Sequence, residues 1–353
     1  MRNIELGSEF DLALNKLNLV SDNLLNCLRI NNTEWYNYGR TAIRQIPILK
    51  QKKVLLPEFI CDSVIECFSR EQIIFYNVNQ DLSLDVSDIL EKTDKNVGYI
   101  YVAHYFGYIQ SEKDMQLIRK YADENGIIII EDITQSLFSD ISYIGDYLIA
   151  SVRKWGPIPQ GGILCVNNEK FVSEKNILSV SDDNTKAYGM VLKNMFLNDN
   201  YDTNEKYRNI FAESENKIDT NLEQKKISDF AMFIIQCIDI GELVQRRKKN
   251  LIRLQGGLEK IGIMPIKKFR DEECPLVFPI KVRNRDDFRK YLIENRIYCA
   301  VHWPYTQWYG INRKNAELNA QTLISLPLDQ RYGDKEIDYL IKTIKKYRGE
   351  LLF

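Results

Sequence analysis

Short apolar runs alternate with amphipathic segments between residues 54 and 166 of this chain. Each run is rich in β-branched and aromatic residues and is bounded by polar or turn-forming positions, which is typical of buried strands. The pattern predicts a strand at each of these runs: KKVLLP near 54, IIFYNV near 73, VGYIYVAH near 97, GIIIIED near 126, DYLIAS near 146 and GGILCV near 161.

One segment between these runs, KDMQLIRKYADENG, carries its apolar residues at helical spacing and ends on a glycine suited to a helix C-cap. The apolar positions are Met115, Leu117, Ile118, Tyr121 and Ala122, and the glycine is Gly126. Continuous apolar strands joined by helical crossovers predict an α/β fold with a mostly parallel sheet covered on both faces. In such sheets, ligands bind at the C-terminal ends of the strands.

The second half of the chain has a different pattern. Residues 170 to 230 are polar and poorly periodic, so helices mixed with loops are expected there. Ile227 to Leu258 predicts one long helix, and its basic cluster RRKKNLIRLQ is interpreted as a solvated face. Beyond it, CPLVFPIKV and IYCAVHWP predict strands, and DKEIDYLIKTIKKY predicts a terminal helix. We therefore expect a large α/β domain over 1–245, including the N-terminal segment, and a small α+β domain over 246–353.

Composition narrows the possible environments and partners. The 353 residues are 44% hydrophobic and 27% charged with a net charge of −1, so nothing indicates binding to nucleic acid. The N-terminus lacks an apolar h-region and no stretch approaches a membrane span, so no membrane association is expected. Seven cysteines without a CxxC pair favour a reducing cytoplasm, and two histidines are too few for a histidine-rich metal site.

The candidate chemistry lies between Ile127 and Gly162. Asp132 ends one apolar run, Ser151 and Lys154 follow the end of the next, and a Gly-Gly pair comes shortly after. A pyridoxal phosphate enzyme needs a lysine amine for a Schiff base with the cofactor aldehyde. It also needs a carboxylate for the pyridine nitrogen and a hydroxyl for the phosphate. The order of these groups and their strand-end placement indicate such a site.

Each group also has an ordinary explanation. Lys154 alone is also consistent with a surface charge at the start of a loop, and Asp132 with a helix N-cap. Gln135, one short turn later, is equally consistent with a surface amide. Ser-x-x-Lys also occurs in penicillin-binding proteins, but no Lys-Thr-Gly partner appears downstream here. Upstream, Gly39 precedes a short amphipathic helix whose N-terminus suits a phosphate. The conjunction of these groups favours the cofactor site.

Several motifs together resemble one family. They are GRTAI at 39–43, LLPEFICDSV, VAHYFG, the E-D-x-x-Q-S stretch at 131–136, GDYxxxSxRKW with P-x-GG after it, and SLPLDQRYGDKEIDYLIKTI. From about Gly39 to Tyr347 the chain resembles the sugar aminotransferases of the DegT/DnrJ/EryC1/StrS group. They belong to fold type I of the pyridoxal phosphate enzymes. The resemblance implies a large domain with a mostly parallel, seven-stranded sheet and a small C-terminal α+β domain.

The resemblance also implies roles for individual residues. Lys154 would form the Schiff base and then shuttle a proton, and Asp132 would pair with the pyridinium nitrogen. Gln135 would hydrogen-bond the 3-hydroxyl. The phosphate would be held by Ser151 and by the turn at Gly39, Arg40 and Thr41, mainly through backbone N–H groups.

The chain departs from the family pattern at several positions. Gln160 stands before the Gly-Gly pair where relatives have glutamate. Where many members stack an aromatic ring over the cofactor, this chain has Cys61, with Phe59 two residues earlier. These departures indicate a divergent branch.

The two histidines are further candidates for the substrate pocket. His104 lies at a strand end, where it either lines the pocket or is a satisfied structural histidine. His302 lies in an aromatic stretch with Trp303 and Tyr305, which suits stacking on a sugar or nucleotide, a core, or a dimer interface.

The resemblance implies a cytoplasmic, homodimeric pyridoxal phosphate aminotransferase. It would transfer an amino group from an amino acid such as glutamate to a nucleotide-linked keto-sugar, for surface polysaccharide or glycoside synthesis. Two alternatives remain. One is a sugar dehydratase, although those relatives replace the lysine with histidine. The other is a noncatalytic regulatory or scaffold protein that keeps the fold.

Overall fold

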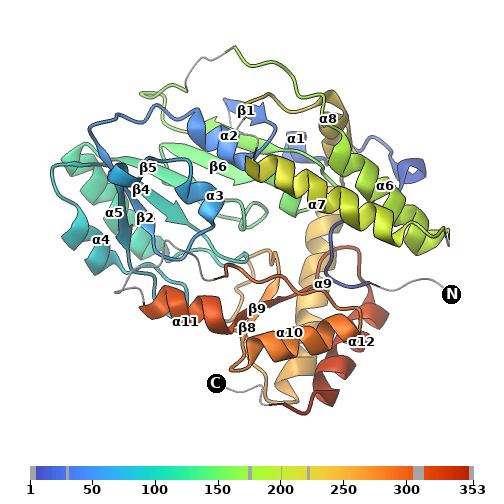
Figure 1. Cartoon of the computed structure of the whole chain (residues 1–353). Helices are drawn as coiled ribbons and strands as arrows, with labels where there is room; N and C mark the ends of the chain where they lie inside the picture. The colour runs from blue at the N-terminus through green and yellow to red at the C-terminus, as the bar shows by residue number, and fades with distance from the viewer. Residues whose placement is uncertain are drawn as a thin grey trace.

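The computed structural model describes residues 5–28, 32–173, 177–199, 201–220, 223–304 and 314–349. Its elements form a large sheet with surrounding helices and a smaller C-terminal lobe (Figure 1). No helix in these ranges is long and apolar enough to cross a membrane.

The large sheet has seven strands in the order β1-β7-β6-β5-β4-β2-β3. Only β7 runs antiparallel to its neighbours, and the other adjacent pairs are parallel. The predicted mostly parallel sheet is confirmed, and all seven residues of the central strand β4 are buried. The strands are β1 (Thr33–Tyr36), β2 (Lys53–Pro57), β3 (Ile73–Tyr76), β4 (Val97–Ala103), β5 (Ile128–Asp132), β6 (Tyr147–Ser151) and β7 (Gly162–Val166).

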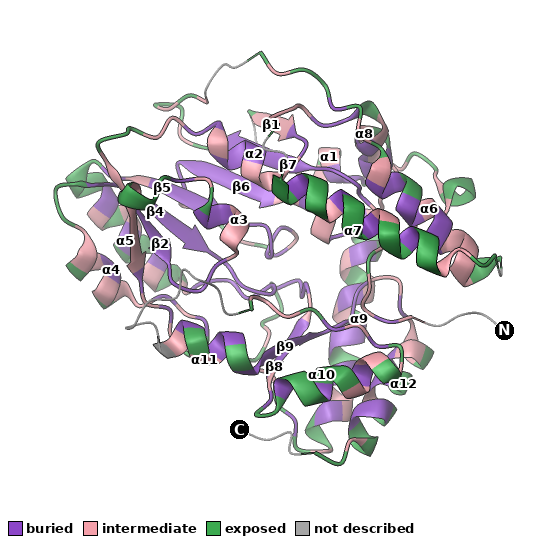
Figure 2. Ribbon diagram, viewed as in Figure 1, coloured by how far each residue is buried: buried purple, intermediate pink, exposed green. Residues whose placement is uncertain are grey.

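The helices of this part are mostly short. The amphipathic pattern at 113–126 is confirmed in α5, which buries Met115, Ile118 and Ala122 and ends at Gly126, whose φ is +65°. The helices are α1 (Leu24–Cys27), α2 (Gly39–Arg44), α3 (Asp62–Ile65), α4 (Val86–Lys92) and α5 (Glu112–Asn125), with 3₁₀ turns η1 (Leu14–Lys16) and η2 (Arg70–Gln72). Figure 2 shows α4 and α5 with buried inner faces and exposed outer faces, whereas α2 and α3 carry only buried and intermediate residues.

The segment between the sheet and the small lobe contains four helices. They are α6 (Thr185–Asn198), α7 (Asn204–Thr220), α8 (Asp229–Gln236) and α9 (Ile240–Glu259). The single long helix predicted from Ile227 to Leu258 is wrong, because the chain breaks between α8 and α9. Asp239 caps α9 by accepting a hydrogen bond from the backbone N–H of Glu242, and this cap starts a new helix.

The small lobe is built on an antiparallel pair, β8 (Phe278–Lys281) and β9 (Leu323–Leu326). The strand expected at 297–304 is not formed, because that segment makes only isolated bridges from Ile297 to Leu6 and from Ala300 to Ser325. Helices complete the lobe, with α12 packed against α9: α10 (Arg285–Glu294), α11 (Lys314–Thr322) and α12 (Asp334–Lys346).

The N-terminal segment, residues 5–10, contacts the small lobe through Leu6 and the large part of the molecule through Glu9 and Phe10. Leu6 is fully buried in the same apolar cluster as Phe278, Leu326 and Ile337. The predicted boundary at 245 falls inside α9, so one helix is common to both predicted domains. Leu6 near the N-terminus and Ile337, Leu340 and Ile344 of the last helix therefore belong to one apolar cluster.

Candidate active site

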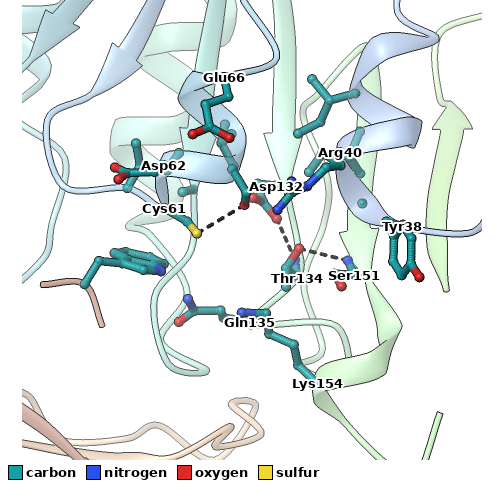
Figure 3. Close-up of a pocket in the computed structure, with 18 of the residues that line it drawn as sticks. Tyr38, Arg40, Cys61, Asp62, Glu66, Asp132, Thr134, Gln135, Ser151 and Lys154 are labelled. Atoms are coloured by element: carbon teal, nitrogen blue, oxygen red, sulfur yellow. Dashed lines mark hydrogen bonds between the residues drawn. The ribbon is translucent and has the colours of Figure 1, made fainter. Parts of the chain in front are cut away.

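A cavity of about 490 Å³ lies at the C-terminal ends of the central strands. It is bounded by the ends of β4, β5 and β6, the start of α2, the loop into α3, helix α7 and Trp303. Asp132, Thr134 and Ser151 lie across the middle of this first cavity, between Arg40 on one side and Gln135 and Lys154 on the other (Figure 3). The structure therefore brings together most of the candidate residues.

Asp132 is fixed by two hydrogen bonds at the end of β5. Its Oδ2 accepts from the hydroxyl of Tyr101 at 2.7 Å, and its Oδ1 accepts from the backbone N–H of Thr134 at 2.9 Å. Burial raises the pKa of Asp132 although both bonds and the nearby Lys154 charge lower it. A positively charged partner, such as a protonated ring nitrogen, would stabilise the ionised form of this buried carboxylate.

Lys154 lies on a 3₁₀ turn, η3 (Val152–Lys154), directly after β6. The next residue, Trp155, is almost fully buried, and its indole N–H donates to the carbonyl of Thr134 at 2.7 Å. From the small lobe, Gln330 donates to the backbone carbonyl of Trp155 at 2.6 Å. The lysine turn is therefore held to the Asp132 loop on one side and to the small lobe on the other.

Glycines allow three backbone segments to meet beside Ser151. A Cβ at Gly39 would lie 3.3 Å from the Cβ of Ser151, and one at Gly162 would lie 2.1 Å from the carbonyl oxygen of Tyr38. A Cβ at Gly161 would collide with Val152 at 2.3 Å. Both members of the Gly-Gly pair are thus required, because they let β7 pass close to the start of α2 and to the lysine turn.

Ser151 and the start of α2 provide polar groups on this wall. The backbone N–H of Ser151 donates to Thr134 Oγ1 at 3.0 Å, which orients the end of β6. Thr41 directs its hydroxyl to Asn37 Oδ1 at 2.6 Å and its backbone N–H to the carbonyl of Tyr38 at 3.1 Å, so both of its donors are occupied. The first N–H groups of a helix lack partners within it, which suits an anionic group here.

Arginine pairs with α7 close this side of the cavity, and the sequence interpretation did not include them. Arg40 donates to the carbonyl of Ile218 at 2.8 Å and to Asp219 at 2.9 Å. Arg153, next to Lys154, makes two bonds to Glu215 at 2.9 and 3.1 Å. Although burial lowers the pKa of Arg153, the Glu215 carboxylate raises it above its usual value. The sequence offered one indication that Arg153 lies at the site, which is its position next to Lys154.

The opposite wall carries Gln135, Cys61 and Trp303. Gln135 Oε1 accepts from the backbone N–H of Phe106 at 2.6 Å, which leaves its NH₂ group for a ligand. Cys61 lines the cavity, whereas Phe59 is fully buried behind it. The ring of Phe59 lies 5.1 Å from that of Trp303, which does line the cavity. Phe59 therefore supports this wall from the core and is not placed at the cofactor.

The two histidines have different surroundings. His104 pairs with the buried Glu131 through Nε2 at 2.9 Å, and its Nδ1 accepts from the backbone N–H of Gln110 at 3.1 Å. His104 lines the first cavity, as one of the two interpretations expected, but both of its ring nitrogens are used within the protein, which leaves none to bond a substrate. His302 bonds Ser325 through Nδ1 at 2.9 Å, and burial, then the charge of Lys154, lowers its pKa to about 3. Tyr305 lies outside the described residues.

Gln160 explains one departure from the family pattern. It is buried, and its NH₂ group donates to Ser181 Oγ at 2.9 Å and to the carbonyl of Asp183 at 2.7 Å. Its Oε1 accepts from the backbone N–H of Ser228 at 3.3 Å. An amide supplies both donor and acceptor for these loops, which a carboxylate does not. Gln160 therefore holds the loops around the cavity and is not part of its lining.

Comparisons with known proteins agree with this geometry. The sequence profile of the DegT/DnrJ/EryC1/StrS aminotransferase family matches residues 42–345. A curated relative, dTDP-3-amino-3,6-dideoxy-alpha-D-galactopyranose transaminase of Aneurinibacillus thermoaerophilus, is 20% identical over 283 residues. That match covers 75% of this chain and 69% of the relative.

Solved structures share the fold. The sugar aminotransferase CalS13 from Micromonospora echinospora is 16% identical with a TM-score of 0.64, and the match covers 90% of this chain and 88% of that one. NtdA from Bacillus subtilis, solved with bound cofactor PMP, is 16% identical with a TM-score of 0.62, and the match covers 90% of this chain and 73% of that one.

The residues present fit pyridoxal phosphate. The cavity pairs a buried carboxylate of raised pKa with a lysine one turn past the neighbouring strand. It also has a glycine-lined cradle between Ser151 and α2. The profile match spans most of the sequence, including both the cavity and the small lobe. The chain therefore belongs to the DegT/DnrJ/EryC1/StrS aminotransferase family, whose cofactor is pyridoxal phosphate.

Proposed function

We propose that this aminotransferase moves an amino group from an amino acid such as glutamate to a keto-sugar carried by a nucleotide. The observation that carries the proposal is the convergence of Lys154, Asp132, Gln135 and Ser151 on one cavity at the strand ends. The family and the dTDP-amino-sugar transaminase among the relatives support a nucleotide-linked sugar as acceptor. Surface polysaccharide or glycoside synthesis is the context we propose.

The chemistry divides between the cofactor and the chain. When bound, pyridoxal phosphate supplies an aldehyde carbon for amines and a ring that stabilises negative charge on the substrate carbon. Lys154 Nζ accepts a proton from that carbon and returns it at the new position. Asp132 keeps a proton on the ring nitrogen through a charge-assisted hydrogen bond. Gln135 orients the ring through its free NH₂ group, and Ser151 binds the phosphate. Trp303 lines the small-lobe side of this cavity.

We also propose a homodimer in the cytoplasm. Sites of fold type I enzymes usually lie at a subunit boundary, so a second copy would complete the walls of this cavity. Size-exclusion chromatography with light scattering should give about twice the mass of one chain. A monomer with full activity would overturn the dimer proposal.

The alternatives are less consistent with the residues present. A sugar dehydratase of this group would carry histidine in place of Lys154. A noncatalytic scaffold would not need the hydrogen bonds that fix Asp132 and the lysine turn.

A screen tests the proposed reaction. The cofactor-loaded protein should convert nucleotide-linked keto-sugars to amino sugars in the presence of amino acids, followed by mass spectrometry of the sugar product. A visible absorbance band lost on borohydride treatment would show a lysine that reacts with the cofactor. Its absence in a folded protein mixed with cofactor would favour the scaffold.

A further inference from the structure

A second cavity of about 480 Å³ lies on the other side of Lys154. It shares Arg153, Lys154 and Glu215 with the first cavity. Its remaining walls come from the N-terminal segment, from α6 and α9, and from the small lobe. A molecule in this second cavity would therefore approach the reactive lysine from the side away from the α2 cradle.

The walls of the second cavity carry more positive than negative side chains. Three carboxylates line it, and each is paired with a neighbouring cation. Glu215 binds Arg153 and Lys186, Glu9 binds Lys186, and Asp329 binds Arg331. Three cations have no ion pair within the described ranges, and they are Lys154, Arg247 and Arg289.

Arg247 is the buried member of this set, with 1% of its surface exposed. Its Nε donates to Gln330 at 2.9 Å, and its Nη1 donates to the carbonyls of Pro275 and Leu276 at 3.1 and 2.8 Å. Its Nη2 makes no hydrogen bond within the part of the chain that the structure describes. Burial lowers the pKa of this guanidinium below its usual value. Its guanidinium lies over the Trp155 ring at 4.7 Å, and the charge of Asp329 acts on it although the two form no ion pair. A buried cation without a directly bonded carboxylate still gains from an anion brought into the adjoining space.

Arg289 is the exposed member. It lies on α10 of the small lobe, and its Nε donates to the carbonyl of Cys299 at 3.2 Å. This bond holds the side chain beside the second cavity while its Nη groups remain without acceptors among the residues described. A guanidinium held in this way can bind a carboxylate or phosphate through two parallel hydrogen bonds.

We propose that the second cavity binds the anionic group of a substrate, with Arg247 and Arg289 as its anchors. The proposal deepens the proposed transamination and rests on it for the identity of the substrate. Two sources of the same chemistry fit. One is the carboxylate of the amino donor and the other is the diphosphate of the nucleotide sugar. Both would place their reacting carbon toward Lys154, since that residue is common to both cavities.

Binding of unreactive anions to the cofactor-loaded enzyme tests this site. Glutarate carries the two carboxylates of glutamate and no amino group, and thymidine diphosphate carries the nucleotide without the sugar. Titration calorimetry gives the affinity of each probe without any turnover. Arg289→Gln should weaken at least one of them about ten- to a hundredfold, because a hydrogen bond to a charged group contributes about 1.5–3 kcal/mol.

Two further variants control the measurement. Lys290→Gln removes the same charge from the adjacent exposed residue of α10, which does not line the cavity, and should leave affinities unchanged. Arg289→Lys keeps the charge but loses the planar fork and should recover part of the affinity. Arg247→Lys is a second test, with circular dichroism to show that the protein remains folded.

The outcomes separate the two sources. Loss of glutarate binding alone assigns the cavity to the amino donor, and loss of diphosphate binding alone assigns it to the acceptor. Loss of both assigns it to both half-reactions. Equal affinities in Arg289→Gln and Lys290→Gln would overturn the proposal even if transamination proceeds. Conversely, loss of binding in a protein that transaminates no sugar would retain the anion site and overturn the proposed function.

Discussion

Lys154 lies where two differently constructed walls meet. The strand-end wall consists of Asp132 and Ser151, the last residues of two neighbouring strands, and of Thr134. The backbone N–H groups of Thr134 and Ser151 join them by donating to side-chain oxygens of Asp132 and Thr134. The charged wall consists of Glu9, Lys186, Glu215 and Arg331, which line the second cavity, together with the ion pair of Glu5 and Lys193, which does not line it. Its contacts join the N-terminal segment to residues far along the chain, with separations of 185 residues for Lys193 to Ser8 and 323 for Arg331 to Ser8.

The two walls are held in place by different means, and this difference predicts which substitutions change the reaction and which change binding or stability. Strand register fixes the strand-end wall, so its groups are held in one geometry, as chemistry on a bound ring requires. The charged wall depends on the docking of α6, α7 and the N-terminal segment, and its cations keep their positions through ion pairs. We therefore expect substitutions in the strand-end wall to change the reaction. Substitutions in the charged wall should change binding and stability instead.

The largest effect is expected at Lys154. Lys154→Ala removes the group that moves the proton, and a positioned base alone contributes about 10²–10⁴-fold to rate. Turnover should fall below detection while thermal unfolding stays near wild type. Borohydride reduction followed by peptide mapping should place the pyridoxyl label on Lys154 in the wild type. Lys170→Ala, at an exposed position, is the control. Label on a different lysine would show that the site has been assigned wrongly.

Asp132 comes next. Asp132→Asn keeps the shape of the side chain and one oxygen that can accept from the backbone N–H of Thr134. It loses the second acceptor oxygen, used by Tyr101, and the negative charge that favours a protonated ring nitrogen. Preorganised charge of this kind contributes about 10²–10³-fold to rate, so a loss of about that size in kcat is expected. Cofactor affinity should change much less. Near wild-type turnover would contradict the role of Asp132. Tyr101→Phe, which removes one bond to the carboxylate, should have a smaller effect in the same direction.

The residues of the strand-end wall could be predicted from the sequence because they lie at the ends of apolar runs. Apolar runs with polar ends predicted six strands of the large sheet and placed Asp132, Ser151 and Lys154 correctly at strand ends. The short edge strand β1 was not predicted, since TEWY is mostly half-exposed and has no continuous apolar run. The sequence also did not predict that Tyr101 bonds Asp132, because a tyrosine in a buried strand is usually a core residue.

The lining of the second cavity and the start of α9 were not predictable in the same way. The cluster beginning at Arg246 was interpreted as a solvated helix face, yet Arg247 is buried and holds the loop at Pro275. Helical periodicity predicts that charged residues of a helix are exposed. Arg247 is an exception because the small lobe packs over it. The break before α9 was missed for a similar reason, because the cap at Asp239 competes with an otherwise helical pattern.

A moderate effect is expected at Ser151. Ser151→Ala removes a hydroxyl from the phosphate cradle and should weaken cofactor binding about ten- to a hundredfold, the value of one hydrogen bond to a charged group. Fluorescence titration of the apoenzyme with pyridoxal phosphate measures this. Ser63→Ala is a matched control, since its hydroxyl also lies at the first cavity but donates to Cys61. Equal affinities in the two variants would assign the phosphate to another residue.

The smallest effect on the reaction is expected at Lys193, which tests whether the charged wall acts on stability. This side chain is buried and donates to Ser8 and Glu9 in the N-terminal segment, and it pairs with Glu5 at 3.4 Å. Burial, then the charge of Arg331, lowers the pKa of Lys193 from 10.5 to about 8. Between these values the unfolded chain binds a proton that the folded chain has released. The free energy of unfolding should therefore rise with pH across this window.

Lys193→Met removes this titration while Glu5 keeps Arg208 as a partner at 2.8 Å. Urea unfolding from pH 8 to pH 10 should show the wild type gaining stability over the variant by less than about 1.4 kcal/mol for each pH unit. Turnover at pH 7 should remain within a few-fold of wild type. Lys217→Met, on the exposed side of α7, should show no such pH-dependent difference. If the free energy of unfolding changed with pH in the same way in wild type and Lys193→Met, the titration of Lys193 would not contribute to stability. The charged wall would then not act on stability through this lysine.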